Sequence, residues 1–188
     1  MQKGLVNQEL KEKTIFSDVL TNENLSAADK SIERLEQEGI SVITAGSNTT
    51  AHTLSTITYH LSRNSAMLSR LQQELTNVPP SPEKSMTWAQ LEKLPYLTAV
   101  ISEGLRYSYG VPSRLQRISP DVALQYGKWT IPPGTPVGMS IYMMHNSEEH
   151  FPNPRHYDPG RWLQSDSAHL RNYLTPFSRG SRQCLGIK

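Results

Sequence analysis

The only cysteine of this chain, Cys184, lies in a segment rich in glycine and arginine; residues 176–186 read PFSRGSRQCLG. Gly180 and Gly186 lack side chains, which suits a backbone that turns sharply or approaches a planar group closely. Arg182 carries a permanent charge on a planar fork that matches carboxylates. Phe177 adds an apolar cover for the sulfur. The segment is therefore suited to presenting one thiolate to a flat, anionic, metal-bearing ligand.

The alternative interpretation of a lone cysteine is a buried structural thiol in a glycine-rich loop. Two features weigh on the choice. If a helix begins at Cys184, its free N–H groups and dipole favour the thiolate over the thiol. In addition, the order F-x-x-G-x-R-x-C-x-G has five defined positions that occur together.

This order resembles the haem-binding segment of the cytochrome P450 family at every defined position. The resemblance implies that Cys184 is the axial ligand of a haem b iron, whose electron donation favours O–O cleavage. It also implies that Phe177, Gly180, Arg182 and Gly186 surround this cofactor.

A long helix is predicted over residues 26–62, with Asn24 or Ser26 as its cap. Apolar or small residues recur there at a period near 3.6 and without proline: Ile32, Leu35, Gly39, Ile43, Gly46, Thr50, Leu54, Ile57 and Leu61. At ~1.5 Å per residue the helix is a rod of roughly 45 Å or more. Such a helix must cross the body of a domain larger than this chain alone supplies.

The middle of this helix, AGSNTT at residues 45–50, contains residues that weaken a helix. Either a neighbouring helix packs closely on Gly46, or small residues leave room for a ligand beside the Thr49 hydroxyl. The run resembles the family's distal-helix motif, A/G-G-x-D/E-T-T/S, which implies that Thr49 helps to deliver protons to dioxygen. Asn48 stands where the family has a carboxylate. Because an amide cannot titrate, we expect slower turnover or leakage of reduced oxygen.

A helix over 96–107, which Pro95 opens, carries an acid and a base three residues apart. Its apolar stripe comprises Leu97, Ile101 and Leu105, with Glu103 and Arg106 on the opposite side. Taken alone, such a pair is most often solvated and contributes ~0.5 kcal/mol or less. The resemblance instead implies a buried pair, completed by Arg161 from the family's F-x-P-x-R-W segment within 151–175. The resemblance implies that this triad braces the fold near the haem and does no chemistry itself.

Between these segments the pattern changes to shorter elements. Asn64 is predicted to cap a helix, and Thr87 to begin a short helix that ends near Leu94. Short strands are predicted over 115–140, where the resemblance implies that Arg117 meets a haem propionate; a surface position is the alternative. His145 and His150 fit no metal-ligand spacing, so ordinary polar roles are expected.

The length, composition and net charge of the chain exclude several classes of protein. The chain has 188 residues, a net charge of +2 and one cysteine, so it has no internal disulfide. Its mean hydropathy is −0.52 and its basic residues are scattered, which argues against a membrane-spanning protein and against nucleic-acid binding. The predicted fold is mainly α with a small subsidiary β-sheet. Residues 1–188 resemble the C-terminal half of the cytochrome P450 fold, truncated at both ends, with the cysteine loop at 176–188.

The resemblance implies a haem-thiolate monooxygenase that inserts an oxygen atom from O₂ into an apolar organic substrate. Electrons would come from NADPH through cytochrome P450 reductase, whose acidic surface Arg179 and Lys188 suit. The run from Glu103 to Val111 is most similar to fungal secondary-metabolism members, so a terpenoid, polyketide or alkaloid intermediate is the expected substrate. Such members lie on the endoplasmic reticulum membrane; this chain carries no anchor, so a cytoplasmic location is expected if it is expressed as given.

A complete family member is longer on the N-terminal side, and this chain stops four residues after Cys184. The two halves of a cofactor pocket are then not both present. We therefore expect the polypeptide as given to bind haem poorly or not at all. The alternative function is a truncated, non-catalytic relic or an interaction module that no longer holds haem.

Overall fold

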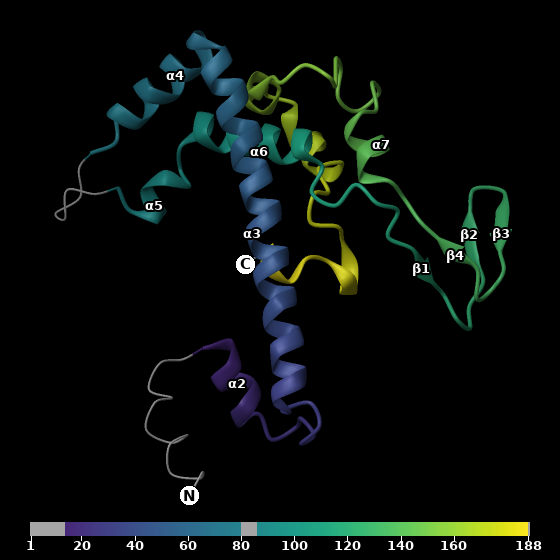
Figure 1. Ribbon diagram of the computed structural model, residues 1–188. Helices are drawn as coiled ribbons and strands as arrows, with labels where there is room; N and C mark the ends of the chain where they lie inside the picture. Colours follow the sequence, from purple (N-terminus) through teal and green to yellow (C-terminus); the bar gives the residue numbers. More distant parts are fainter. Residues whose placement is uncertain (1–13, 80–85, 188) are drawn as a thin grey trace, which may run out of the picture. The chain divides into compact units, whose positions relative to one another are not determined.

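The computed structural model describes residues 14–79 and 86–187 and is mainly helical (Figure 1). Its α-helices are α2 (Ile15–Thr21), α3 (Ile32–Arg63), α4 (Ser65–Thr76), α5 (Trp88–Leu91), α6 (Pro95–Ser108) and α7 (Ile141–His145). Four 3₁₀ turns follow: η1 (Pro159–Leu163), η2 (Ser167–Asn172), η3 (Gly180–Arg182) and η4 (Leu185–Ile187). None of the helices in the described residues is both long and apolar enough to cross a bilayer. The chain divides within α3 into two units, Met1–Asn48 and Thr49–Lys188.

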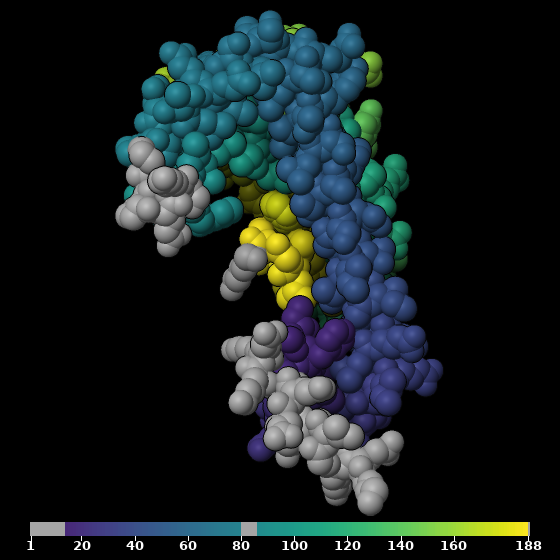
Figure 2. All heavy atoms as spheres, turned by 60° about the vertical axis from the view of Figure 1, so that its left-hand side comes forward, coloured from purple at the N-terminus to yellow at the C-terminus, as the bar shows by residue number. Residues whose placement is uncertain are grey.

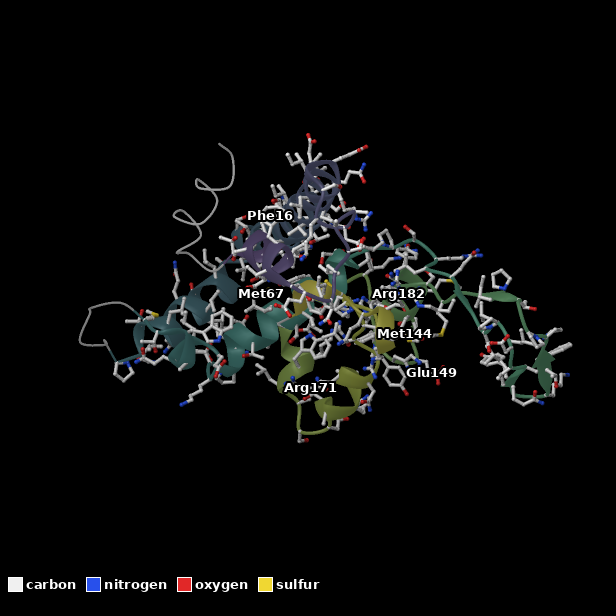
Figure 3. The ribbon with its side chains drawn as sticks, turned by 90° about the horizontal axis from the view of Figure 1, so that it is seen from below. Phe16, Met67, Met144, Glu149, Arg171 and Arg182 are labelled. Atoms are coloured by element: carbon white, nitrogen blue, oxygen red, sulfur yellow. The ribbon has the colours of Figure 1, made fainter. Side chains whose placement is uncertain are left out.

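In the first unit α2 packs on the N-terminal part of α3. The Cβ that an alanine would add at Gly39 would lie 3.0 Å from the ring of Phe16, a residue labelled in Figure 3. The predicted start of the long helix at residue 26 is wrong, because α3 begins at Ile32. Ser26 instead donates from its hydroxyl to Asp29, over 2.6 Å. This local bond satisfies the side chains in a turn that precedes the helix.

In the second unit the C-terminal half of α3 runs antiparallel to α6, with contacts one helical turn apart. The hydroxyls of Thr53 and Ser108 lie 3.0 Å apart. One turn further along α3, Ile57 lies against Gly104, and Leu61 then joins a buried apolar cluster with Tyr96, Val100 and Leu71. This packing fixes α6 at the centre of the unit.

Gly104 allows the closest approach of these two helices. A Cβ at this position would lie 2.3 Å from Cγ1 of Ile57, so Ile57 would have to move. We therefore expect Gly104→Ala to lower the free energy of unfolding by about 1–3 kcal/mol, despite the better helix propensity of alanine. Denaturant unfolding measures this.

The matched control is Gly46→Ala, since Gly46 also lies inside a helix. Within its own unit no described atom comes within 4 Å of the added Cβ. This substitution is expected to be neutral or to stabilise by up to about 1 kcal/mol. Equal effects of the two substitutions would contradict the packing described for Gly104.

The caps predicted for the next helices are confirmed. The Met67 N–H donates to Oδ1 of Asn64 over 3.1 Å at the start of α4, and Thr87 forms a capping box with Gln90 at the start of α5. α5 is shorter than predicted and ends at Leu91. α6 begins at Pro95, and the carboxylate of Glu74 accepts the next two N–H groups, each over 2.8 Å. A carboxylate at this end also suits the helix dipole.

The strands form two separate antiparallel pairs rather than one sheet. β2 (Leu124–Tyr126) pairs with β3 (Trp129–Ile131), and β1 (Arg117–Ile118) pairs with β4 (Pro136–Val137). Figure 1 shows these pairs on an arm that extends away from α6 and α7. Gly127 has a φ of +56° in the two-residue turn between β2 and β3, a conformation that favours glycine.

Candidate functional site

The carboxylate of Glu103 lies at the centre of a buried polar cluster in the second unit. Arg106, one turn further along α6, binds it through two parallel bonds, from Nε to Oε2 over 2.9 Å and from Nη2 to Oε1 over 2.8 Å. Arg161 of η1 donates from its Nε to Oε1 over 3.2 Å. The side chains of Glu103 and Arg106 are fully buried. One carboxylate thus bridges two guanidinium groups from segments far apart in the sequence.

Two further donors complete the carboxylate's bonds. The indole N–H of Trp162 donates to Oε2 over 2.9 Å, and the backbone N–H of Asp158 donates to Oε1 over 3.0 Å. No local sequence pattern gives either residue a role. Their position beside Arg161 in the sequence could have predicted these bonds. A segment that places one arginine against a buried carboxylate also places the neighbouring residues close to it.

The remaining arginine N–H groups donate to backbone carbonyls. Nη1 of Arg106 donates to His145 over 2.9 Å, and Nη1 of Arg161 donates to Pro152 over 3.0 Å. Among the described residues no buried side-chain nitrogen or oxygen lacks a partner. The hydrogen-bonding groups of the cluster are therefore all paired within the protein, and none is left to donate to a ligand.

Electrostatics keep this carboxylate charged. Burial by itself raises the pKa of Glu103, but the hydrogen bond and charge of Arg106, together with Arg161 and the Asp158 N–H, outweigh burial and bring this pKa below its usual value. A carboxylate held in this way does not exchange protons near neutral pH. The cluster can brace three segments, and it is not suited to acid–base catalysis.

The interpretation of Glu103 and Arg106 as a solvated helix pair is wrong. Their side of α6 is buried, whereas Ile101, on the predicted apolar stripe, is 44% exposed. The local pattern could not show this, because the partner that makes burial possible, Arg161, lies 58 residues away from Glu103.

The cysteine loop predicted at 176–188, taken from here on as Thr175 to Gly186, closes on itself through its backbone. The N–H of Ser178 donates to the carbonyl of Thr175 over 3.0 Å, and the N–H of Cys184 donates to the carbonyl of Phe177 over 2.8 Å. Gly180 has a φ of +80°, which favours glycine. These bonds hold Cys184 in a defined place in the loop.

Cys184 itself is a free thiol and exposed. Figure 2 shows the C-terminal residues, in yellow, at the surface of their unit, and Figure 3 labels Arg182, which is also exposed, on this segment. The residues that follow Cys184 form the single 3₁₀ turn η4. One such turn is too short for the helix-dipole argument made from the sequence.

Two contacts fix the start of the cysteine loop to the C-terminal end of α6. Gly110 has a φ of +61°, and an added Cβ would lie 2.6 Å from the carbonyl oxygen of Pro176. His145, fully buried, accepts the Thr175 N–H at Nε2 over 3.0 Å, and its Nδ1 lies 3.0 Å from the carbonyl of Arg106. Neither contact could be predicted from the local sequence pattern. Both histidine nitrogens are used by the backbone, which agrees with an ordinary polar role.

The remaining predicted site residues belong to other elements than the cysteine loop. Gly46 and Asn48 lie on α3 in the first unit, and Thr49 opens the second unit with its carbonyl accepting from the Thr53 hydroxyl over 3.1 Å. Arg117 is exposed on β1 and donates to the carbonyls of Leu115 and Gln116, over 3.3 and 3.0 Å. These bonds are local, and a contact of Arg117 with a haem propionate stays a prediction.

The donor chemistry of the loop fits a haem iron. A haem fills the equatorial positions of its iron and takes an axial ligand from the protein, such as a cysteine thiolate. Cys184 offers one exposed thiol, while the described residues contain no group of three or more histidine, cysteine or acidic side chains that could hold a metal ion. The loop thus offers one protein sulfur, which is the ligand that a haem iron can take from a protein.

Comparisons with known proteins agree with this chemistry. A family model described as Cytochrome P450 matches residues 2–188. Cytochrome P450 monooxygenase tndB from Aspergillus flavipes is 47% identical over 177 residues, which are 93% of this chain and 36% of that protein. Conidiogenone synthase PchP450 from Penicillium rubens is 43% identical over 92% of this chain and 34% of that protein.

A solved structure, retinoic acid-bound cyanobacterial CYP120A1, matches with a TM-score of 0.64 and 28% identity, over 78% of this chain and 33% of that one. The chain thus spans about a third of the length of the relatives that it matches.

Proposed function

Because this chain belongs to the cytochrome P450 family, we propose that it provides the thiolate-bearing part of a haem monooxygenase that inserts one atom of O₂ into an apolar organic molecule. The observation that carries the proposal is the placement of Cys184. The only thiol of the chain is exposed on a closed loop. The first residue of that loop, Thr175, donates to His145, whose carbonyl accepts from Arg106 of the buried Glu103 cluster. Such bracing holds a ligand in place without taking part in the reaction.

In this proposal each residue of the cysteine loop has a separate task. Cys184 ligates the iron as a thiolate, and the bond from its N–H to Phe177 holds it in the loop. When bound, the haem supplies the activation of O₂. Arg182, exposed on the same loop, pairs with a carboxylate of the cofactor. Gly180 and Gly186 keep side chains away from the macrocycle.

The distal residues act on protons and water. The Thr49 hydroxyl passes protons toward the reacting oxygen, Gly46 leaves space beside it, and Asn48 holds a water through its amide without titrating. Arg117 pairs with a haem propionate. These roles rest on the match of AGSNTT and of the Arg117 segment to the family's pattern.

The relatives suggest where such an enzyme acts. Several are fungal monooxygenases, and one is named conidiogenone synthase. We propose a substrate from fungal secondary metabolism, NADPH-cytochrome P450 reductase as the electron donor, and a place at the endoplasmic reticulum membrane.

A chimera tests the function. The aligned 93% of this chain replaces the matching segment of the Aspergillus flavipes relative, with and without Cys184→Ser. The proposal expects a thiolate-type Soret band in the reduced carbon monoxide difference spectrum of the chimera, and its loss with serine. A band that survives the substitution would contradict the assignment of Cys184. A chimera that folds and yet shows no band, while the parent does, would favour the non-catalytic alternative.

A further inference from the structure

His145 is a buried histidine for which the proposed chemistry has no use. It ends α7 and is fully buried, and its imidazole lies between the last turn of α6 and Thr175, the first residue of the cysteine loop. Its backbone carbonyl accepts from Nη1 of Arg106 over 2.9 Å. One residue thus contacts both the cluster around Glu103 and the loop that carries Cys184.

The hydrogen bonds fix the protonation state of this imidazole. The Arg106 carbonyl can only accept, so Nδ1 carries the proton, and the Thr175 N–H can only donate, so Nε2 is bare. His145 is therefore neutral. A second proton would have to occupy Nε2, where it would break the bond to Thr175.

The surroundings of His145 oppose that second proton. Burial lowers the pKa of His145 to about 4 and the charge of Arg106 acts in the same direction, against the Arg106 carbonyl bond and the charge of Glu103, which raise it. The rings of Tyr109 and Phe151 lie 6.4 and 6.1 Å from the imidazole, centre to centre. No carboxylate other than that of Glu103 is among these neighbours, and Arg106 already binds it.

From Thr175 the hydrogen bonds continue to the backbone of Cys184. The Thr175 carbonyl accepts from Ser178, which forms a turn around Pro176 and Phe177, and the Phe177 carbonyl accepts the Cys184 N–H over 2.8 Å. A shift at Thr175 therefore moves the carbonyl that holds Cys184.

We propose that neutral His145 is a positioning residue, which holds the start of the cysteine loop against the end of α6 and thereby sets the place of Cys184. The link to iron rests on the proposed function; the link between His145 and Thr175 does not.

The first test needs no haem and uses the chain as it is. If opening of the loop exposes His145, its ordinary pKa of 6.5 returns in the open state. The open state then binds the extra proton below pH 6.5, so the protection factor of the Thr175 amide against hydrogen exchange should fall about tenfold for each pH unit between pH 6.5 and about 4. The Met67 amide is the internal control, because it donates to the non-titrating amide of Asn64. A Thr175 protection factor that does not change with pH would overturn the proposal.

Two variants separate the two imidazole bonds. His145→Asn can still donate to the Arg106 carbonyl but is too short to reach Thr175, whereas the longer His145→Gln can place its oxygen near the position of Nε2. We expect exchange at Thr175 to be roughly tenfold faster in the Asn variant than in the Gln variant, and the pH dependence to be absent from both. His169→Gln, at an exposed histidine of η2, should change neither the exchange rate at Thr175 nor its pH dependence. Equal exchange in all three variants would overturn the proposal. Should the Asn variant not fold, the pH series on the unsubstituted chain decides alone.

The reduced carbon monoxide difference spectrum measures how His145 affects the ligation of iron by Cys184. In the chimera described above, His145→Asn should lower the fraction of the thiolate-type carbon monoxide complex at neutral pH, and His145→Gln should restore part of it. If the unsubstituted chimera gives no thiolate band, the proposed function fails while the exchange experiment still decides the role of His145. If the band is normal in all variants, the positioning role fails and the function stands.

Discussion

Glu103→Gln is expected to lower the free energy of unfolding of the second unit by about 3–5 kcal/mol, the range for removing one partner of a buried ion pair. The glutamine fills the same volume, so no cavity contributes. It leaves the fully buried Arg106 and the nearly buried Arg161 without a counter-charge, and its amide offers one oxygen where the carboxylate offers two. Denaturant unfolding followed by circular dichroism measures the loss.

The matched control is Glu38→Gln. Glu38 pairs with Arg34 on α3, and both side chains are about half exposed. The expected loss is below about 1 kcal/mol, because water screens an exposed pair. Similar losses for the two substitutions would contradict a bracing role for the buried cluster.

The same comparison has a pH dependence with a definite sign. The pKa of Glu103 is lowered below 4.5 in the folded protein, so the unfolded chain takes up the proton first as the pH falls. The carboxylate's contribution is therefore full above about pH 4.5 and is lost as the pH falls through the folded value. The difference between the unsubstituted chain and Glu103→Gln should shrink over that interval.

Gly110→Ala is expected to cost more than the same substitution at an unobstructed glycine. Any residue other than glycine at a φ of +61° costs roughly 1–2 kcal/mol. Here the new Cβ would also lie 2.6 Å from the carbonyl oxygen of Pro176, which is backbone and cannot rotate away. The total expected loss is about 2–4 kcal/mol. The cysteine loop would have to move away from α6, which faster hydrogen exchange at Thr175 and Ser178 would report.

Gly127→Ala separates the two contributions. Gly127 has nearly the same backbone conformation, with a φ of +56°, and no described atom lies within 4 Å of an added Cβ. It should show the conformational cost alone and leave exchange in the cysteine loop unchanged. If Gly110→Ala costs no more than Gly127→Ala, the contact with Pro176 is not what holds the loop.

Local sequence patterns correctly predicted the helix starts that depend only on neighbouring residues. Asn64, Thr87 and Pro95 begin their helices as expected, since a cap or a proline acts within one turn. The start of the long helix was misplaced, because Ser26 and Asp29 bond to each other in a turn that resembles a cap in sequence.

The candidate site depends on contacts that no local pattern contains. Trp162 and the Asp158 N–H reach Glu103 across more than fifty residues, and His145 reaches Thr175 across thirty. The glycine at position 104 gave one overlooked signal. Glycine inside a helix costs about 1 kcal/mol, so its presence in α6 indicated that another element comes close, and that element is Ile57 of α3.

The central claim is that the sulfur of Cys184 binds iron, and X-ray absorption at the iron edge tests it most directly. Measured on the haem-loaded chimera, the spectrum should contain one sulfur neighbour of the iron besides the four porphyrin nitrogens. In the Cys184→Ser variant that sulfur neighbour should be absent while the nitrogen shell remains. An iron with only nitrogen and oxygen neighbours in the unsubstituted protein, or a sulfur neighbour that survives the substitution, would contradict the account.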